Sequence, residues 1–175
     1  MQIVLDNIET PEWVSYMKPD KKRYNETLFF NKKLKDHRIK GYTTPNGEIR
    51  FVLYLLYKRQ SHSGVSTLTG RICDDNNFYV EGIYTPLEHR GKGLSAILML
   101  EVVRVYRKIY GDTQNTLAGV KIMDKVGSRH DVSYYKPMSI VQESYLAQME
   151  DPEDDKHVEK IHKQAFDIAI LEVAR

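Results

Sequence analysis

Hydrophobic and polar residues alternate along this chain with either the period of a strand, two residues, or that of a helix, about 3.6 residues. The strand period dominates the first half of the chain. Runs rich in β-branched and aromatic residues cover 2–5, 38–43, 49–57, 65–73 and 78–85, and each run predicts a strand. Polar turns separate the last four runs, and the clearest turn is Pro45-Asn46-Gly47. Because strands joined by short turns pair antiparallel, we expect an antiparallel meander over 38–85.

The helical period is strongest over 94–109, which predicts one long amphipathic helix. Its apolar face is formed by Ile97, Leu98, Val102, Val105 and Ile109, and its polar face by Glu101, Arg104 and Lys108.

Weaker patterns predict the remaining elements. A helix is expected to begin at Thr10-Pro11-Glu12 and to stop before Pro19, and a second helix is expected over 24–35. Residues 117–123 and 139–146 are expected to be strands, and 128–136 a short helix. A last helix should begin at Asp151-Pro152-Glu153-Asp154 and bury either Ile168 or Ala169 near its end.

These elements predict a mixed α and β fold (α+β), with a mostly antiparallel central sheet flanked by helices. The 175 residues suit one domain over 1–175, with 150–175 as a C-terminal helical extension. The single cysteine, Cys73, excludes an internal disulfide. Residues 1–9 lack the pattern of a secretory signal, and no apolar run approaches the ~20 residues of a membrane span. We therefore expect a soluble, cytoplasmic protein without a membrane partner.

Positive and negative charges are unevenly distributed along the chain. The net charge is only +2, but residues 18–40 contain nine basic and three acidic side chains, a net of +6. Residues 143–159 contain one basic and seven acidic side chains, a net of −6. The two segments could neutralise each other within one chain or across a homodimer, or the basic segment could attract a nucleic acid.

The candidate chemistry lies in the loop between the strand 78–85 and the helix 94–109. Two glycines and two basic residues, Arg90 and Lys92, precede the helix, whose first N–H groups and dipole suit a phosphate or pyrophosphate. A Walker loop is excluded because Gly93 follows Gly91-Lys92 and position 86 is Pro. A dinucleotide fingerprint matches poorly because Ala96 stands where its third glycine would be. His157 and His162 are five residues apart rather than four, so no metal site is expected.

The stretch Arg90-Gly91-Lys92-Gly93-Leu94-Ser95 resembles the pyrophosphate-binding motif Arg/Gln-x-x-Gly-x-Gly/Ala of the GNAT superfamily of acyl-CoA-dependent N-acetyltransferases. Ser95 stands where that motif usually has Gly or Ala. The resemblance implies a GNAT-like fold and the transfer of an acyl group, in the first place acetyl from acetyl-CoA, directly to an amine acceptor. It also implies a set of cofactor-binding residues: Ile83, Tyr84, Thr85, Arg90, Gly91, Lys92, Gly93, Leu94 and Ser95.

The same resemblance implies two catalytic residues. Glu81, in the middle of its strand, would be the base that deprotonates the amine. The family's second motif places a Tyr on a short helix, commonly as Tyr-x-Lys-x-Gly-Phe, and residues 132–140 match it in outline with Tyr135 as the acid for the leaving thiolate. Two alternatives stay open. One is a GNAT-derived protein that binds nucleic acid through the basic 18–40 face, and the other modifies nucleic acid with another donor.

Overall fold

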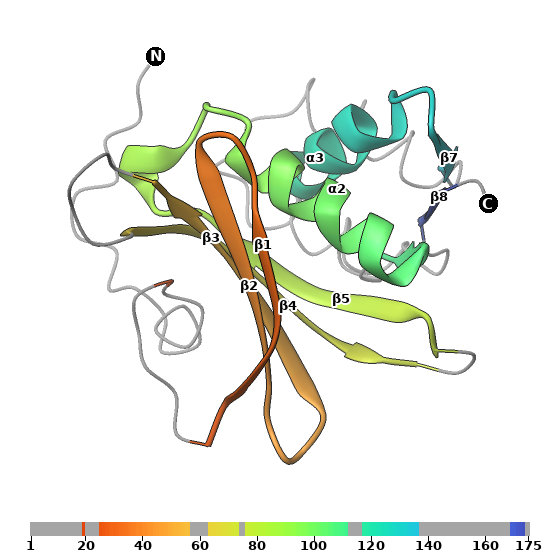
Figure 1. The fold of residues 1–175 in the computed structure, drawn as a ribbon. Helices are drawn as coiled ribbons and strands as arrows, with labels where there is room; N and C mark the ends of the chain where they lie inside the picture. The colour runs from red at the N-terminus through yellow and green to blue at the C-terminus, as the bar shows by residue number, and fades with distance from the viewer. Residues whose placement is uncertain are drawn as a thin grey trace, which may run out of the picture.

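The computed structural model describes residues 19, 25–56, 63–73, 76–111, 117–136 and 169–173. They form one mixed sheet with the strand order β1-β2-β3-β4-β5-β6-β8-β7, together with the helices α2 and α3 (Figure 1). The strands are β1 (Thr27–Lys33), β2 (His37–Thr43), β3 (Glu48–Leu55), β4 (Ser63–Ile72), β5 (Phe78–Tyr84), β6 (Lys108–Tyr110), β7 (Val132–Tyr135) and β8 (Ile170–Val173). The helices are α2 (Leu94–Tyr106), α3 (Leu117–Gly127) and the 3-10 turn η2 (Leu87–His89).

The strands β1 to β5 form an antiparallel meander in which each strand pairs with its neighbour in sequence. The turn between β2 and β3 is closed by the N–H of Gly47, which donates to the carbonyl of Thr44 at 3.0 Å. Gly47 has a φ of 82°, a conformation that glycine adopts without steric cost. The described strands therefore confirm the predicted meander over 38–85.

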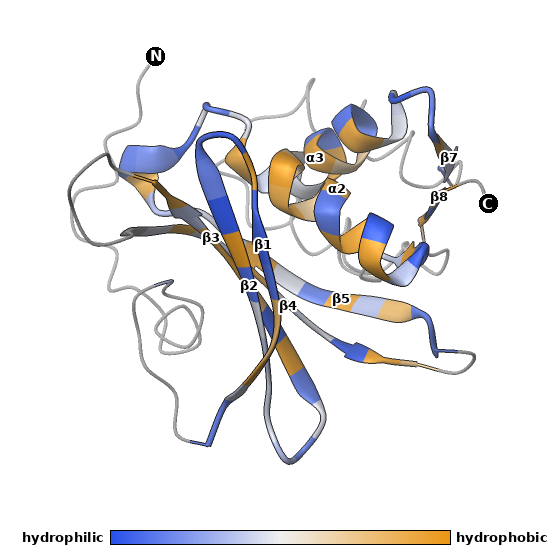
Figure 2. Ribbon diagram, in the orientation of Figure 1, coloured by the Kyte–Doolittle hydropathy of each residue, from blue (hydrophilic) through white to orange (hydrophobic). Residues whose placement is uncertain are grey.

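The main core lies between the sheet and α2. Phe51 and Phe78 are fully buried, and Phe78 stacks on Tyr106 of α2 with the ring centroids 4.8 Å apart. The rings of Phe51 and Tyr106 meet edge to face at 6.0 Å. Apolar residues run along both helices (Figure 2), and Leu98 and Val102 of α2 are completely buried. Burial of this apolar area supplies the main free energy that holds the helix on the sheet.

The predicted helix over 24–35 is wrong, because these residues contain β1. Its sequence, TLFFNKK, is rich in aromatic and β-branched residues, which favour strands. The segment is a strand because it pairs with β2, from Thr27↔Thr43 to Lys33↔Arg38. The rings of Phe29 and Phe30 contact the ring of Phe51 edge to face, although Leu28 and Phe29 stay 47% and 45% exposed on this outer strand.

Two predictions in the second half of the chain are also wrong. Residues 117–123, expected to be a strand, begin α3, which buries Val120, Met123 and Val126 at a helical spacing of three residues. Residues 128–136, expected to be a helix, contain β7 instead. Val132 is buried and Tyr134 packs against the core, which is the alternation of a strand.

The long helix α2 is shorter than predicted and buries one of its charged residues. It ends at Tyr106 because Arg107 turns to a φ of 66° while its N–H still donates to the carbonyl of Val103. The predicted face is also shifted, because Glu101 is 5% exposed while Val105 is 37% exposed. Lys32 donates to Glu101 at 2.5 Å and Arg104 donates to it at 2.9 Å, and these ion pairs allow the carboxylate to be buried.

The C-terminal part differs from the predicted helical extension over 150–175. Residues Ile170–Val173 form β8, which lies between β6 and β7 in the sheet, and Ala169 just before it is buried as expected. The rest of that extension lies outside the described residues, as do the elements expected over 2–5, 10–18 and 139–146. Neither of the two described helices is long and apolar enough to cross a membrane.

Candidate functional site

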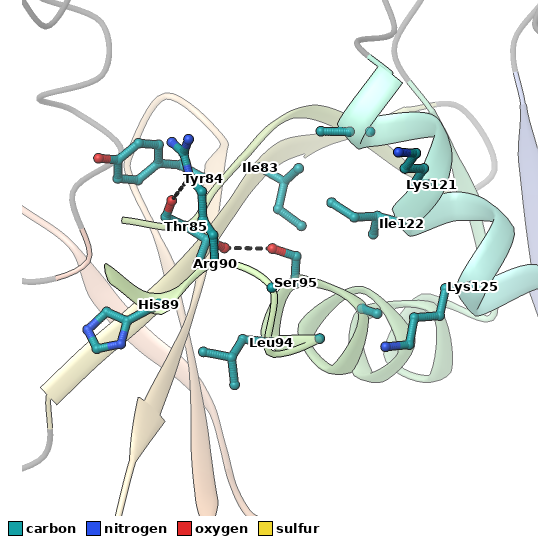
Figure 3. A pocket seen from close by; sticks show the side chains of 15 residues that line it. Ile83, Tyr84, Thr85, His89, Arg90, Leu94, Ser95, Lys121, Ile122 and Lys125 are labelled. Atoms are coloured by element: carbon teal, nitrogen blue, oxygen red, sulfur yellow. Dashed lines mark hydrogen bonds between the residues drawn. The ribbon is translucent and has the colours of Figure 1, made fainter. Parts of the chain in front are cut away.

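The site begins at a β-bulge in β5. Thr69 of β4 pairs with Gly82 while Gly70 pairs with Val80, so Glu81 is an extra residue without an opposite partner. The bulge shifts the side-chain alternation of β5 by one residue after Val80. Ile83 consequently shares the core face with Val80, and its side chain points towards α3 (Figure 3).

Beyond this bulge, β5 separates from β6. The two strands are parallel and pair only at Phe78↔Ile109 and Tyr79↔Tyr110, so in the described part of the chain the second half of β5 has no strand partner on that side. A cavity of about 630 Å³ lies beside this open edge. Its walls are the end of β5, the loop after it, the first turn of α2 and one side of α3: Ile83, Tyr84, Thr85, His89, Arg90, Gly91, Gly93, Leu94, Ser95, Ala96, Ala118, Gly119, Lys121, Ile122 and Lys125.

The loop exposes the N-terminus of α2 to this cavity. Gly91 and Gly93 have φ angles of 75° and 72°, and Gly93 is the N-cap of the helix. No side chain among the described residues caps the helix, and its first described intrahelical bond runs from the N–H of Ile97 to the carbonyl of Gly93. The N–H groups between these residues therefore have no helical partner, and they carry the positive end of the helix dipole.

The two basic residues of the loop have different positions. Arg90 lines the cavity, and its Nε donates to the carbonyl of Thr85 at 2.8 Å, which braces the start of the loop. Lys92 does not line the cavity, and its ammonium donates to the carbonyl of Glu88 at 3.2 Å. Eight of the nine residues expected to bind a cofactor thus border one cavity, and Lys92 is the exception.

A chain of hydroxyl groups connects the helix to the sheet below this loop. Ser95 Oγ and Thr85 Oγ1 share a hydrogen bond of 2.6 Å, and Thr85 Oγ1 and Ser66 Oγ share one of 2.9 Å (Figure 3 draws the first). Ser66 is fully buried in β4. The serine that departs from the usual Gly or Ala therefore has a structural partner in this chain.

The predicted strand over 117–123 hides the wall that α3 forms. The sequence contains a pattern that indicates this helix, because the apolar residues Val120, Met123 and Val126 recur every three residues. A helix with that buried face presents Lys121 and Lys125, which are four residues apart, to the cavity. His89 was also missed; it lines the cavity, and its buried Nδ1 has no hydrogen-bond partner in the described structure.

The two expected catalytic residues do not line the cavity. Glu81 is exposed and accepts an ion pair from Arg71 at 2.8 Å. Tyr135 is 60% exposed on β7, whereas burial, with Asp124 nearby, raises the pKa of its neighbour Tyr134 above the ordinary value for tyrosine.

The helix α3 ends at Gly127 and packs against β7. Gly127 is required for packing, because a Cβ at this position would lie 2.2 Å from the ring of Tyr134.

The described part of the basic segment 18–40 forms β1 and the start of β2 instead of a helix, and none of its residues lines the cavity. Its charges are partly engaged, since Lys32 pairs with Glu101 and Arg38 donates to the side chain of Asn31 at 2.7 Å. The acidic segment 143–159 lies outside the described residues. Among the described residues, no group of His, Cys, Asp and Glu side chains could hold a metal ion.

Comparison with known proteins gives little similarity. No family model matches the sequence, and a search of curated proteins finds no match. Among solved structures, the chain is similar to a protein assigned as a streptothricin acetyltransferase from Bacillus anthracis str. Ames, which was solved with acetyl coenzyme A. That alignment covers 86% of each chain, with a TM-score of 0.40 and 16% sequence identity. Similarity at this level does not show that the two proteins share an activity. The function proposed below therefore rests on the loop and the cavity.

Proposed function

We propose that this protein is a GNAT-like N-acyltransferase that transfers acetyl from acetyl-CoA to an amine. The observation that carries the proposal is a glycine-bearing loop that opens an uncapped helix N-terminus onto a cavity of about 630 Å³. Such a terminus binds phosphate groups through its free N–H groups and its dipole. The motif that resembles the GNAT pyrophosphate loop lies at this same terminus.

The cofactor would bind along two features of the cavity. Its diphosphate would accept hydrogen bonds from the backbone N–H groups of 91–95, with Arg90 beside it. The pantetheine arm would extend along the open edge of β5 near Ile83 and Thr85, where the strand has lost its neighbour β6. A flexible arm with two amide groups can pair with such an edge as an added strand does.

The transfer requires a neutral amine, because an ammonium group has no lone pair with which to attack. Its nitrogen would form a bond to the thioester carbonyl carbon, the bond from that carbon to sulfur would break, and the CoA thiolate would take up a proton. In this proposal Glu81 is the base and Tyr135 is the acid for the thiolate. Because neither lines the cavity, water would relay both protons.

Thermal unfolding tests the cofactor. A ligand at 100 times its Kd adds ~2.7 kcal/mol to stability, so saturating acetyl-CoA should raise the Tm of this chain by about 5 °C or more. Arg90→Glu should remove most of that rise, because it puts a negative charge beside the diphosphate. Lys35→Glu makes the same change of charge at the exposed turn between β1 and β2 and should keep the rise. An unchanged Tm at millimolar acetyl-CoA would contradict the proposal.

A further inference from the structure

The helix α3 brings a second source of positive charge to the start of α2. Lys121 and Lys125 lie one turn apart on α3, and both line the cavity. Lys125 extends towards the loop before α2 (Figure 3), and a Cβ built on Gly93 would lie 2.8 Å from its Nζ. The ammonium group thus occupies the space that a side chain at position 93 would fill.

This cation has no negative partner within the described residues. Neither Lys121 nor Lys125 has a carboxylate at ion-pair distance there, although Asp124 lies between them in the sequence. The carboxylate of Asp124 accepts instead from Lys136, at 2.8 Å and 3.1 Å.

Charge repulsion makes this arrangement unfavourable without a ligand. The ammonium of Lys125 lies beside the positive end of the α2 dipole, and Arg90 borders the same cavity. Like charges repel each other, and because Lys121, Lys125 and Arg90 are exposed, solvent screens part of the repulsion. A multivalent anion between α2 and α3 would turn the repulsion into attraction on both sides.

We propose that Lys125, supported by Lys121, is a ligand of the acyl-CoA diphosphate. The diphosphate is then held between the N-terminus of α2 and the side of α3, rather than by the loop alone. This inference rests on the proposed function and adds to it a specificity: the site selects acyl carriers with a diphosphate over acyl-pantetheine. It also gives Gly93 a second role, since any side chain there would displace the ammonium.

Calorimetric titration of the full chain with CoA and with pantetheine tests this proposal. Lys125→Ala should weaken CoA binding about tenfold, which is the typical contribution of one charge-assisted hydrogen bond, and leave pantetheine binding unchanged. Lys125→Arg should retain most of the CoA affinity because it keeps the charge. Lys35→Ala removes an exposed lysine remote from the cavity and should bind both ligands like the wild type. Added salt should reduce the effect of Lys125→Ala, since salt screens exposed charges.

The outcomes separate this inference from the proposed function. Equal CoA affinity in Lys125→Ala and wild type would overturn the inference, and so would an equal loss of CoA and pantetheine binding. If the wild type binds no CoA, the proposed function fails, and titration with inorganic pyrophosphate then decides the inference alone. Weaker pyrophosphate binding by Lys125→Ala would support an anion site between α2 and α3, and no binding by the wild type would overturn it.

Discussion

Ser95 shows how one residue connects the start of α2 to the sheet. Its hydroxyl shares a 2.6 Å hydrogen bond with Thr85, which in turn bonds the buried Ser66. Ser95→Ala should lower the free energy of unfolding by about 1 kcal/mol, the usual net value of such a bond. Urea unfolding measures this loss, with Ser133→Ala on the exposed part of β7 as the matched control. If both variants lose the same amount, the hydroxyl chain does not stabilise the loop.

The residues of the loop could be predicted, and those of the opposite wall could not. Gly91 and Gly93 stand between a strand and a helix in the sequence itself, so the local pattern is enough to locate the helix terminus proposed to bind phosphate. Lys121 and Lys125 belong to the site only because α3 packs beside α2. Their role depends on tertiary contacts, which no local pattern reports.

At the scale of elements, the aromatic contact between α2 and the sheet makes stability depend on pH. Burial raises the pKa of Tyr106 to about 12, and its ring stacks on Phe78. A tyrosine whose pKa is higher in the folded state holds its proton more tightly there, so its contribution is fully present below pH ~10 and is lost as pH rises towards 12.

The free energy of unfolding should therefore fall between pH 10 and pH 12, and urea titrations at several pH values measure this fall. Tyr106→Phe keeps the stacked ring but removes the ionisable hydroxyl, so it should make the decline shallower while changing the value at pH 7 much less. Burial also raises the pKa of Tyr134, which accounts for the decline that remains. A decline of the same steepness in this variant would show that another group causes it.

The elements were predicted well where sequence neighbours pair and poorly where distant segments pair. The strands β2 to β5 follow turns and alternation that the sequence displays directly. In contrast, β1, β7 and β8 lie at or near the two sides of the sheet, and for each of them the sequence pattern predicts a helix. Short runs such as TLFF and VSYY fit both periods for one or two turns, and only pairing with a partner strand decides between them.

For the whole molecule, β8 closes the second half of the sheet. Leu171 is fully buried between β6 and β7, and the N–H of Val173 donates to the carbonyl of Arg107 at 2.7 Å. Leu171→Ala should cost about 3 kcal/mol through lost burial and the cavity left behind. Leu28→Ala makes the same truncation on β1 at a side chain that is 47% exposed and should cost less than about 1 kcal/mol. Denaturant unfolding of the pair compares them, and equal losses would argue against β8 as a core strand.

The position of β8 also determines when the sheet can be completed during protein synthesis. The strands β1 to β5 can pair as soon as each leaves the ribosome, because every partner is the preceding strand. β7 has to wait, since the strand that joins it to β6 is translated only at residues 170–173. Until residues 170–173 emerge, the nascent chain therefore carries an unpaired edge on β6, and unpaired strand edges favour pairing with other chains.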